Sequence, residues 1–427
     1  MKITPTGFEF NDFKSFKRFA VDQGLIGSIS LTDPILDKSG NVLIKEKVNI
    51  KDSMMKKLED LDGQYIADFK LSFSGELMKK IKEQVARAVY RRFEDKSNDF
   101  LNYIYKESNT HLPNFRGIIL NAFCTRNLTL VFFRILLEKP IFFNHCADLG
   151  LLSLGSVIQK KTGVKMVNRY SFLAGILADI SLIDTDYWKN PLNGDCTAVL
   201  SKFSTKVCEQ LNLPFEVSDA INGHPILDLT MENGINAEGI ESDSIRNGKY
   251  FNEILTTNAT GDSVTSENEE GDEGAGEKSA EFATEALRIG RYIMENLKST
   301  TDKNQVSEKL LVMFTYNTEK GYFRKDIADP MISQFKMFDT VIQRIRIISD
   351  VENKCRFPKS AWAYPKPKSA QILCKNSKFE CPLIVSGWDI NVIATQDPFG
   401  YIGTHLPAGG YPKCALEEEL QERLGRE

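Results

Sequence analysis

Two polar side chains that can hold a metal ion lie within two apolar segments near the middle of the chain. His145 belongs to segment 142–158, and Asp179 belongs to segment 170–184. In each segment, apolar residues recur at intervals of three and four, which is the spacing of one buried helix face. These residues are Leu151, Leu154 and Ile158 in the first segment and Phe172, Ile176 and Ile180 in the second. We therefore expect two core helices, each carrying one potential metal ligand.

The composition is typical of a globular protein. With 427 residues the chain is long enough for about two or three domains, and its hydrophobic content of 42% and charged content of 26% are ordinary. A formal net charge of −4 gives no electrostatic reason to expect nucleic acid or an anionic membrane as a partner.

Targeting and membrane signals are not apparent in the sequence. Residues 1–7 lack the apolar region of a signal peptide, and no run approaches the roughly 18 apolar residues of a membrane helix. The 8 cysteines are scattered, unlike a disulfide framework. We expect a cytoplasmic protein with no membrane span.

The segment around Asp179 resembles the signature of an HD-GYP domain, the phosphodiesterase family that cleaves cyclic di-GMP at a multinuclear, iron-type metal centre. The family motif Leu-His-Asp-Ile-Gly-Lys falls on residues 177–182, which read Leu-Ala-Asp-Ile-Ser-Leu. The motif's His therefore corresponds to Ala178 and its Lys to Leu182. His145 stands where the family carries a His on the preceding helix.

The resemblance continues towards residue 224 and implies a third metal-ligand position. His224 falls on the first residue of the family's His-His pair, and Pro225 on the second. A catalytic binuclear site needs roughly six or more protein ligands. The relic positions His145, Asp179 and His224 are too few, so we expect no metal or other cofactor, and a hydrogen bond between His145 and Asp179. The alternative is an Fe or Mn ion held by these three residues.

The expected fold is mainly α, with an HD-superfamily helical bundle as its core. We expect four parts: a small N-terminal α/β domain at 1–75, a helical connector at 76–135, a degenerate HD-GYP-like domain at 136–350, and a small β-rich region at 351–427. Segment 34–44 reads as a β-hairpin with its turn at 37–41. Within the third part, residues 256–280 are acidic and rich in Gly and Ser, which predicts a disordered insertion.

Residues 76–93 predict a long helix with a regular apolar face. Leu77, Ile81, Val85 and Val89 advance by four residues, with Lys and Arg between them. Such a helix between domains is often a dimer seam, and the alternative is a core helix with a basic exposed face. We expect a protein partner, or self-association, through this helix.

Four cysteines gather in the C-terminal region, at Cys355, Cys374, Cys381 and Cys414. Their spacing is irregular and lacks a Cys-x-x-Cys knuckle. We expect free thiols there, with a zinc site as the alternative.

The resemblance, with Ala178, Leu182 and Pro225 in place of functional residues of the family, implies a pseudoenzyme. The expected function is that of a catalytically inactive HD-GYP-like protein, a binding or scaffolding component of bacterial signalling with a cyclic dinucleotide as a candidate ligand. The alternative is a metal-dependent cyclic di-GMP phosphodiesterase with a non-standard site built on His145, Asp179 and His224.

Overall fold

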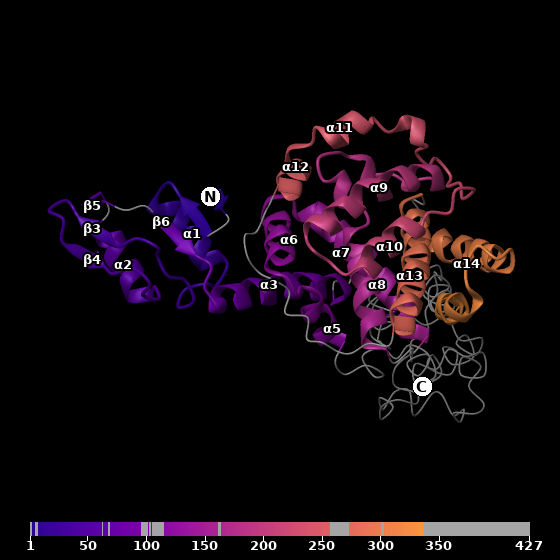
Figure 1. The fold of residues 1–427 in the computed structure, drawn as a ribbon, viewed down its shortest axis with the longest axis horizontal. Coiled ribbons are helices and arrows are strands. Elements are labelled where there is room, and N and C mark those ends of the chain that lie inside the picture. The colour runs from indigo at the N-terminus through magenta and orange to yellow at the C-terminus, as the bar shows by residue number, and fades with distance from the viewer. Residues whose placement is uncertain are drawn as a thin grey trace, which may run out of the picture.

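The structure is a computed structural model that describes residues 2–4, 7–61, 63–66, 69–94, 101, 104, 115–160, 164–256, 273–299 and 303–336. These residues are mainly helical, with small sheets confined to the N-terminal part (Figure 1), which confirms the prediction of a mainly α fold. The HD-superfamily bundle stays a prediction. The predicted β-rich region at 351–427, with its four cysteines, lies outside the described residues.

The N-terminal part contains strands and short helices that lead into a long helix. In chain order its elements are β1 (Lys2–Thr4), β2 (Gly7–Phe10), α1 (Phe13–Asp22), β3 (Ile35–Asp37), β4 (Val42–Ile44), α2 (Asp52–Asp60), β5 (Tyr65–Ile66), β6 (Phe69–Ser72) and α3 (Gly75–Glu94).

The remaining described elements form the helical body. They are α5 (Phe115–Ala122), α6 (Arg126–Glu138), α7 (Pro140–Lys160), α8 (Lys165–Leu177), η1 (Ile180–Leu182), η2 (Tyr187–Lys189), α9 (Gly194–Gln210), α10 (Phe215–Gly223), η3 (Ala237–Gly239), α11 (Ser242–Arg246), α12 (Lys249–Thr256), α13 (Glu273–Ser299) and α14 (Lys303–Glu319).

Two antiparallel sheets, each of three strands, hold the N-terminal part together. Their strand orders are β1-β2-β6 and β4-β3-β5. The predicted hairpin is confirmed as β3–β4: the Asp37 carboxylate accepts from the backbone N–H of Ser39 and of Asn41, each at 2.8 Å, and Gly40 supplies the positive φ of 87° that the turn requires.

Helix α1 was not predicted. The Asp12 side chain caps its N-terminus by accepting from the Ser15 N–H at 2.7 Å.

Aromatic side chains join the N-terminal part to the helical body. The ring of Phe133 on α6 lies 6.0 Å from that of Phe8 and 6.2 Å from that of Phe19, measured between centroids. Aromatic pairs at such distances contribute to packing beyond the area that they bury. The N-terminal part therefore packs against α6 through these rings. It continues along the chain into α3 (Figure 1).

The apolar face of α3 is covered within the same chain. Leu77, Ile81, Val85 and Val89 are all 0% exposed, and α3 packs against α5, α6 and α7. The segment predicted as a connector is thus part of the helical body, and the apolar seam proposed for self-association is occupied inside one molecule. Self-association through another face of this helix stays a prediction.

Helices α7, α8 and α13 form the centre of the body and pack closely at glycines (Figure 1). A Cβ added to Gly175 of α8 would lie 2.6 Å from the Cα of Gly150 on α7. One added to Gly290 of α13 would lie 2.7 Å from the backbone nitrogen of Ser153 on α7. Real Cβ atoms do not approach other atoms this closely, so the three backbones lie in direct contact there.

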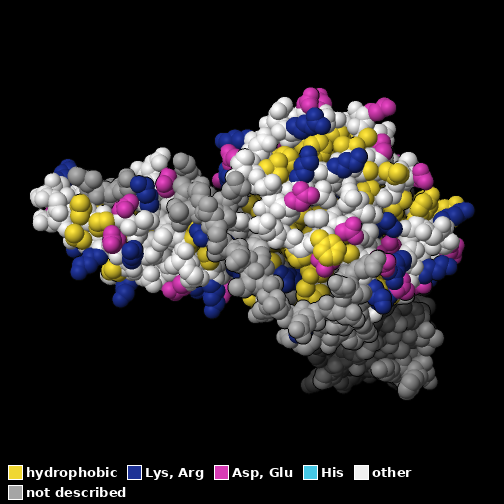
Figure 2. Space-filling model, viewed as in Figure 1, with side chains coloured by type: hydrophobic (Ala, Val, Ile, Leu, Met, Phe, Trp, Pro, Cys, Tyr) yellow, Lys and Arg dark blue, Asp and Glu magenta, His cyan; other side chains and the backbone are white. Residues whose placement is uncertain are grey.

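Helix α7 is apolar enough to cross a membrane, but it is a core helix. Its stretch Pro140–Ile158 has a mean hydropathy of 1.4, and 83% of it is buried inside the protein. Among the described residues, the other candidate for a span is the pair α5 and α6, which is bent by 105° at its break. Figure 2 shows basic and acidic side chains interspersed on the visible face of the molecule.

The second predicted helix is shorter than expected. It was predicted to reach Asp184, but α8 ends at Leu177, and Asp179 adopts φ −104° and ψ 9° at the junction with η1. The Ser204 hydroxyl donates to the Ala178 carbonyl at 2.8 Å, so a side chain of α9 satisfies this helix-terminal carbonyl.

The predicted acidic insertion is also shorter than expected. Its first residue, Thr256, belongs to α12, and α13 begins at Glu273, so residues 273–280 are helical. Ser279 and Ala280 are buried, so the end of the predicted insertion belongs to the core. Residues 257–272 lie outside the described part of the chain.

We predict that Gly175→Ala lowers the free energy of unfolding by about 1–3 kcal/mol or more, because the added methyl forces α7 and α8 apart. Gly117→Ala on α5 is the matched control: no atom lies within 4 Å of its added Cβ. The control should be neutral or stabilise by up to about 1 kcal/mol. Chemical denaturation of both variants tests this, and equal stabilities would contradict the close packing.

Candidate functional site

The predicted pair of His145 and Asp179 is brought together in the core. His145 lies on α7, Asp179 follows α8, and the imidazole Nε2 is 2.6 Å from the carboxylate Oδ2. Both residues are buried, at 7% and 0% exposed. The expected hydrogen bond between the two side chains is confirmed.

A third residue, Arg291 of α13, completes this contact and was not predicted. Its Nη1 donates to Asp179 Oδ2 at 2.8 Å, and its Nη2 donates to Oδ1 at 2.5 Å. The guanidinium thus holds both oxygens of the carboxylate in a bidentate ion pair, the geometry that arginine favours. Both oxygens of Asp179 are engaged by donors from this chain.

Helix α13 supplies two more charged groups that balance the site. Arg291 Nη1 also donates to Glu295 Oε1 at 3.2 Å, and the Lys298 ammonium donates to both Glu295 oxygens at 3.2 Å. The backbone N–H of Leu192 donates to Glu295 Oε2 at 2.9 Å. Two carboxylates therefore face two cations, which lets the charges remain in an interior where an unpaired charge is strongly disfavoured.

The protonation states follow from these contacts. Burial acts to raise the pKa of Asp179, but Arg291 and His145 outweigh it and hold that pKa well below its usual range. Burial, with Lys298 nearby, lowers the pKa of His145. Asp179 is therefore ionised and His145 neutral, with the proton on Nε2 facing the carboxylate. The other ring nitrogen, Nδ1, is then a hydrogen-bond acceptor.

The third predicted position, His224, lies apart from this network. Its Nδ1 donates to the Ile221 carbonyl at 2.6 Å, and burial lowers its pKa to about 3. Its Nε2 is buried and has no partner among the described residues. A small cavity of about 20 Å³, also lined by Arg291, adjoins His224. The structure therefore brings His145 and Asp179 into contact. His224 makes no contact with them and lies beside the small cavity that Arg291 also lines.

These residues do not fit a metal centre. A metal would need lone pairs of Asp179 and the Nε2 of His145, but Arg291 and the His145 proton engage those atoms. The guanidinium already places a positive charge beside Asp179, and a divalent cation would be repelled by it. No group of three or more His, Cys, Asp or Glu side chains suited to a metal occurs within the described ranges.

Apolar side chains occupy the positions at which the HD-GYP resemblance would put two further metal ligands, at residues 178 and 225, and a lysine, at residue 182. Ala178 and Leu182 are buried, at 1% and 0% exposed, and Pro225 lines the small cavity beside His224. None of these side chains can coordinate a cation.

The charged residues of α13 could have been recognised from their spacing in the sequence. Arg291, Glu295 and Lys298 follow one another at four and three residues, which places them on one helix face. They lie among apolar residues that are now seen to be buried, such as Leu287 and Ile293. Charges at this spacing beside buried apolar residues are a signal for a buried ionic network that sequence reasoning could have used.

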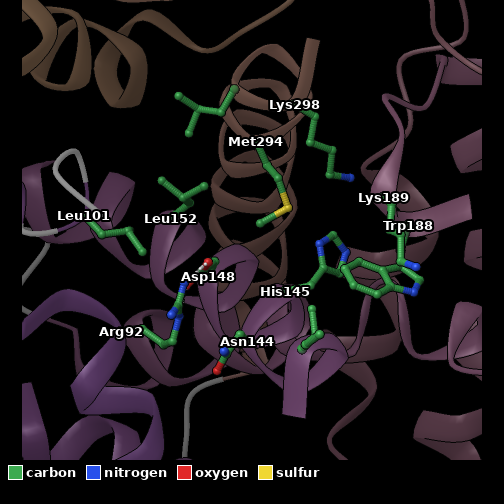
Figure 3. Close-up of a pocket in the computed structure, with 12 residues that line it drawn as sticks. Arg92, Leu101, Asn144, His145, Asp148, Leu152, Trp188, Lys189, Met294 and Lys298 are labelled. Atoms are coloured by element: carbon green, nitrogen blue, oxygen red, sulfur yellow. Dashed lines mark hydrogen bonds and ion pairs between the residues drawn. The ribbon is translucent and has the colours of Figure 1, made fainter. Parts of the chain in front are cut away.

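A pocket of about 500 Å³ opens beside His145, which we call the Trp188 pocket (Figure 3). The indole of Trp188, from η2, lies 5.2 Å from the His145 ring and 5.6 Å from the Phe142 ring, between centroids. The apolar part of the lining is Leu101, Ile141, Leu152, Trp188, Met294 and Leu297. An apolar hollow of this size with a few polar groups is the usual form of a small-molecule site.

The polar groups of the Trp188 pocket lie on two sides. Arg92 of α3 and Asp148 of α7 point towards each other (Figure 3) and form a bidentate pair, with both hydrogen bonds at 2.8 Å. On the other side, Lys298 and Lys189 lie near the indole of Trp188.

Compared with protein-family models, curated proteins and solved structures, the chain matches none of them. The functional argument therefore depends on the geometry of the site.

We predict that Arg291→Met lowers the free energy of unfolding by about 3–5 kcal/mol, because it leaves buried carboxylates without their main partner. Arg291→Lys should lose less, since it keeps the charge but not the bidentate geometry. The double variant Asp179→Leu/Arg291→Met should lose less than the sum of its single changes.

The control for this series is Arg18→Ala. Arg18 is paired with Asp22 at the surface, and its side chain is 83% exposed. Its removal should change stability by about 1 kcal/mol or less. Additive effects of the two core changes in a denaturation cycle would contradict a direct Asp179–Arg291 interaction.

We also predict a histidine-dependent loss of stability in acid. The folded pKa of His224 is about 3, against an ordinary value of 6.5, so between these values the unfolded chain binds a proton that the folded chain does not. Stability should be complete above pH 6.5 and fall by about 1.4 kcal/mol per pH unit as the pH drops towards 3. His224→Asn should remove this part of the slope in denaturation at pH 8, 6 and 5. An unchanged slope would show that His224 titrates normally in the folded state.

Proposed function

We propose that this protein is a catalytically inactive, HD-GYP-like binding or scaffolding component of bacterial signalling, linked to a cyclic dinucleotide and located in the cytoplasm. The observation that carries the proposal is the bidentate ion pair between Arg291 and Asp179. It occupies the acidic position where the resemblance implies a metal.

The chemistry of phosphodiester cleavage supports the absence of catalysis. Metal-dependent cleavage needs a cation that generates hydroxide near neutral pH and neutralises charge on the reacting phosphate. A guanidinium can stabilise charge, but it has no bound water to ionise. The resemblance would place a second ligand at Ala178 and a phosphate-facing Lys at Leu182, and both side chains are buried and apolar.

Binding does not require that machinery. The network around Arg291 is charge-balanced and closed, whereas the adjoining Trp188 pocket is open to a ligand. This combination favours a protein that senses or carries a ligand without transforming it. The alternative, a cyclic di-GMP phosphodiesterase with a non-standard Fe or Mn site, would require Arg291 to leave Asp179.

We predict that the purified protein does not hydrolyse cyclic di-GMP and contains well under one Fe, Mn or Zn ion per chain. Product analysis after incubation with Mn²⁺ or Fe²⁺, together with elemental analysis, tests this. Two tightly held metal ions, or turnover that disappears in Asp179→Asn, would overturn the proposal. Lys202→Ala, an exposed change on α9, is the control for non-specific effects of substitution.

A further inference from the structure

We propose that the small cavity beside His224 binds one water molecule, which donates a hydrogen bond to His224 Nε2 and accepts one from Arg291 Nε. The site is distinct from the Trp188 pocket, and it does not depend on the proposed function. The bound water connects the ion-pair network of α13 to the end of α10, where His224 follows Gly223.

Two polar atoms at this cavity are buried without a protein partner. They are His224 Nε2 and Arg291 Nε, and neither has a hydrogen-bond partner within the described part of the chain. The two residues are 3% and 5% exposed, and both line the same cavity. A buried polar group without a partner costs free energy, so nearly all such groups are satisfied by protein or by ordered water. Two unpartnered atoms at one cavity indicate that a single bound group satisfies both.

The contacts of the two side chains determine which atom donates and which accepts. His224 Nδ1 lies 2.6 Å from the Ile221 carbonyl and must carry the ring proton, because a carbonyl only accepts. Burial keeps this imidazole neutral, so its Nε2 presents a lone pair. Arg291 directs Nη1 and Nη2 at Asp179 and Glu295, which leaves its Nε–H as a donor. The ligand therefore has to donate on one side and accept on the other.

The charges around the cavity disfavour an ion of either sign. Arg288 and Arg291 line the cavity and would repel a cation. Glu295 also lines it, and its carboxylate, with the lone pair of His224, would repel an anion. A water molecule is neutral and offers both a donor and an acceptor.

The size of the cavity fits one water molecule. Its volume is about 20 Å³, above the roughly 10–15 Å³ that a single water requires and far below the volume of an organic ligand. Much of the remaining wall is apolar, so a bound water would be held at the polar end. The apolar side chains are those of Leu192, Ile226, Leu229 and Met231.

Thr197 of α9 supplies a third hydrogen-bonding group. Its hydroxyl donates to the Gly194 carbonyl at 2.8 Å, and the residue is 4% exposed and lines the cavity. The hydroxyl oxygen keeps lone pairs that can accept the second hydrogen of the water. Buried waters typically make about three hydrogen bonds. The water thus links α9, the end of α10 and α13.

The direct test is a high-resolution crystal structure of the full chain, with crystals grown in chloride and others soaked in bromide. We expect one solvent peak within about 2.7–3.2 Å of both His224 Nε2 and Arg291 Nε, and no anomalous signal there after the bromide soak. An empty cavity, or a peak that contacts only one of the two atoms, contradicts the proposal. An anomalous peak would identify an anion site and would also overturn it.

A solution measurement makes the test independent of crystals. In water-selective NMR on the full chain with nitrogen-labelled arginine and histidine, the Arg291 Nε–H should show a cross-peak to a long-lived water. The loss of this signal in Arg291→Lys assigns it. The His224 Nε2 should give the shift of an unprotonated ring nitrogen near neutral pH. Absence of the cross-peak, or a protonated Nε2, contradicts the proposal.

Variants assign the water to this site. His224→Phe keeps an aromatic ring but removes the lone pair, and it should weaken the cross-peak of Arg291 severalfold. Thr197→Val should weaken it less, whereas Thr197→Ser keeps the hydroxyl and should leave it unchanged. Lys202→Ala, an exposed change on the same helix as Thr197, is the control and should behave as the wild type does. A full cross-peak in His224→Phe would show that His224 does not hold the water.

Discussion

The arrangement of the helical body depends on one buried ion pair, between Arg291 and Asp179. A guanidinium in the interior is tolerated only when its charge and hydrogen-bond donors are matched, and here they face Asp179 and Glu295. The pair forms because α13 lies directly on α7 at Gly290, next in sequence to Arg291, while Gly175 brings α8 against α7. The glycine contacts therefore bring the helices that carry Arg291 and Asp179 close together.

His145 connects this closed network to the open pocket beside it. Its Nε2 contributes to the charge balance around Asp179, and its ring forms part of the wall on which Trp188 rests. The contact with Asp179 also keeps the His145 proton on Nε2, so that Nδ1 is left as an acceptor. A change at Asp179 should consequently affect ligand recognition as well as stability, because Nδ1 would no longer be held as an acceptor.

Periodicity predicted the helices α3, α7 and α8, and turn chemistry predicted the β3–β4 hairpin, since both depend on local spacing. The residues at which helices begin and end were less predictable. Helix α8 ends before Asp179, where the distant residue Ser204 donates to the Ala178 carbonyl. Helix α13 extends into the acidic segment, where Ser279 and Ala280 are buried. The sequence showed the four-residue spacing of Leu77 to Val89. An apolar face with this spacing can lie in a dimer interface or in the core of a single chain. Its burial against α5, α6 and α7 follows from how the chain folds back.

The sequence alone determined that His145 and Asp179 lie on or beside two core helices. That too few ligands surround them for a binuclear centre stays a prediction. It also contained the stripe Arg291, Glu295 and Lys298, whose spacing places three charges on one helix face. Only the tertiary structure decided that this face meets Asp179, that His224 stays apart, and that Trp188 borders a pocket. Residues more than a hundred positions apart are joined by long-range packing, and local periodicity carries no information about which faces will meet.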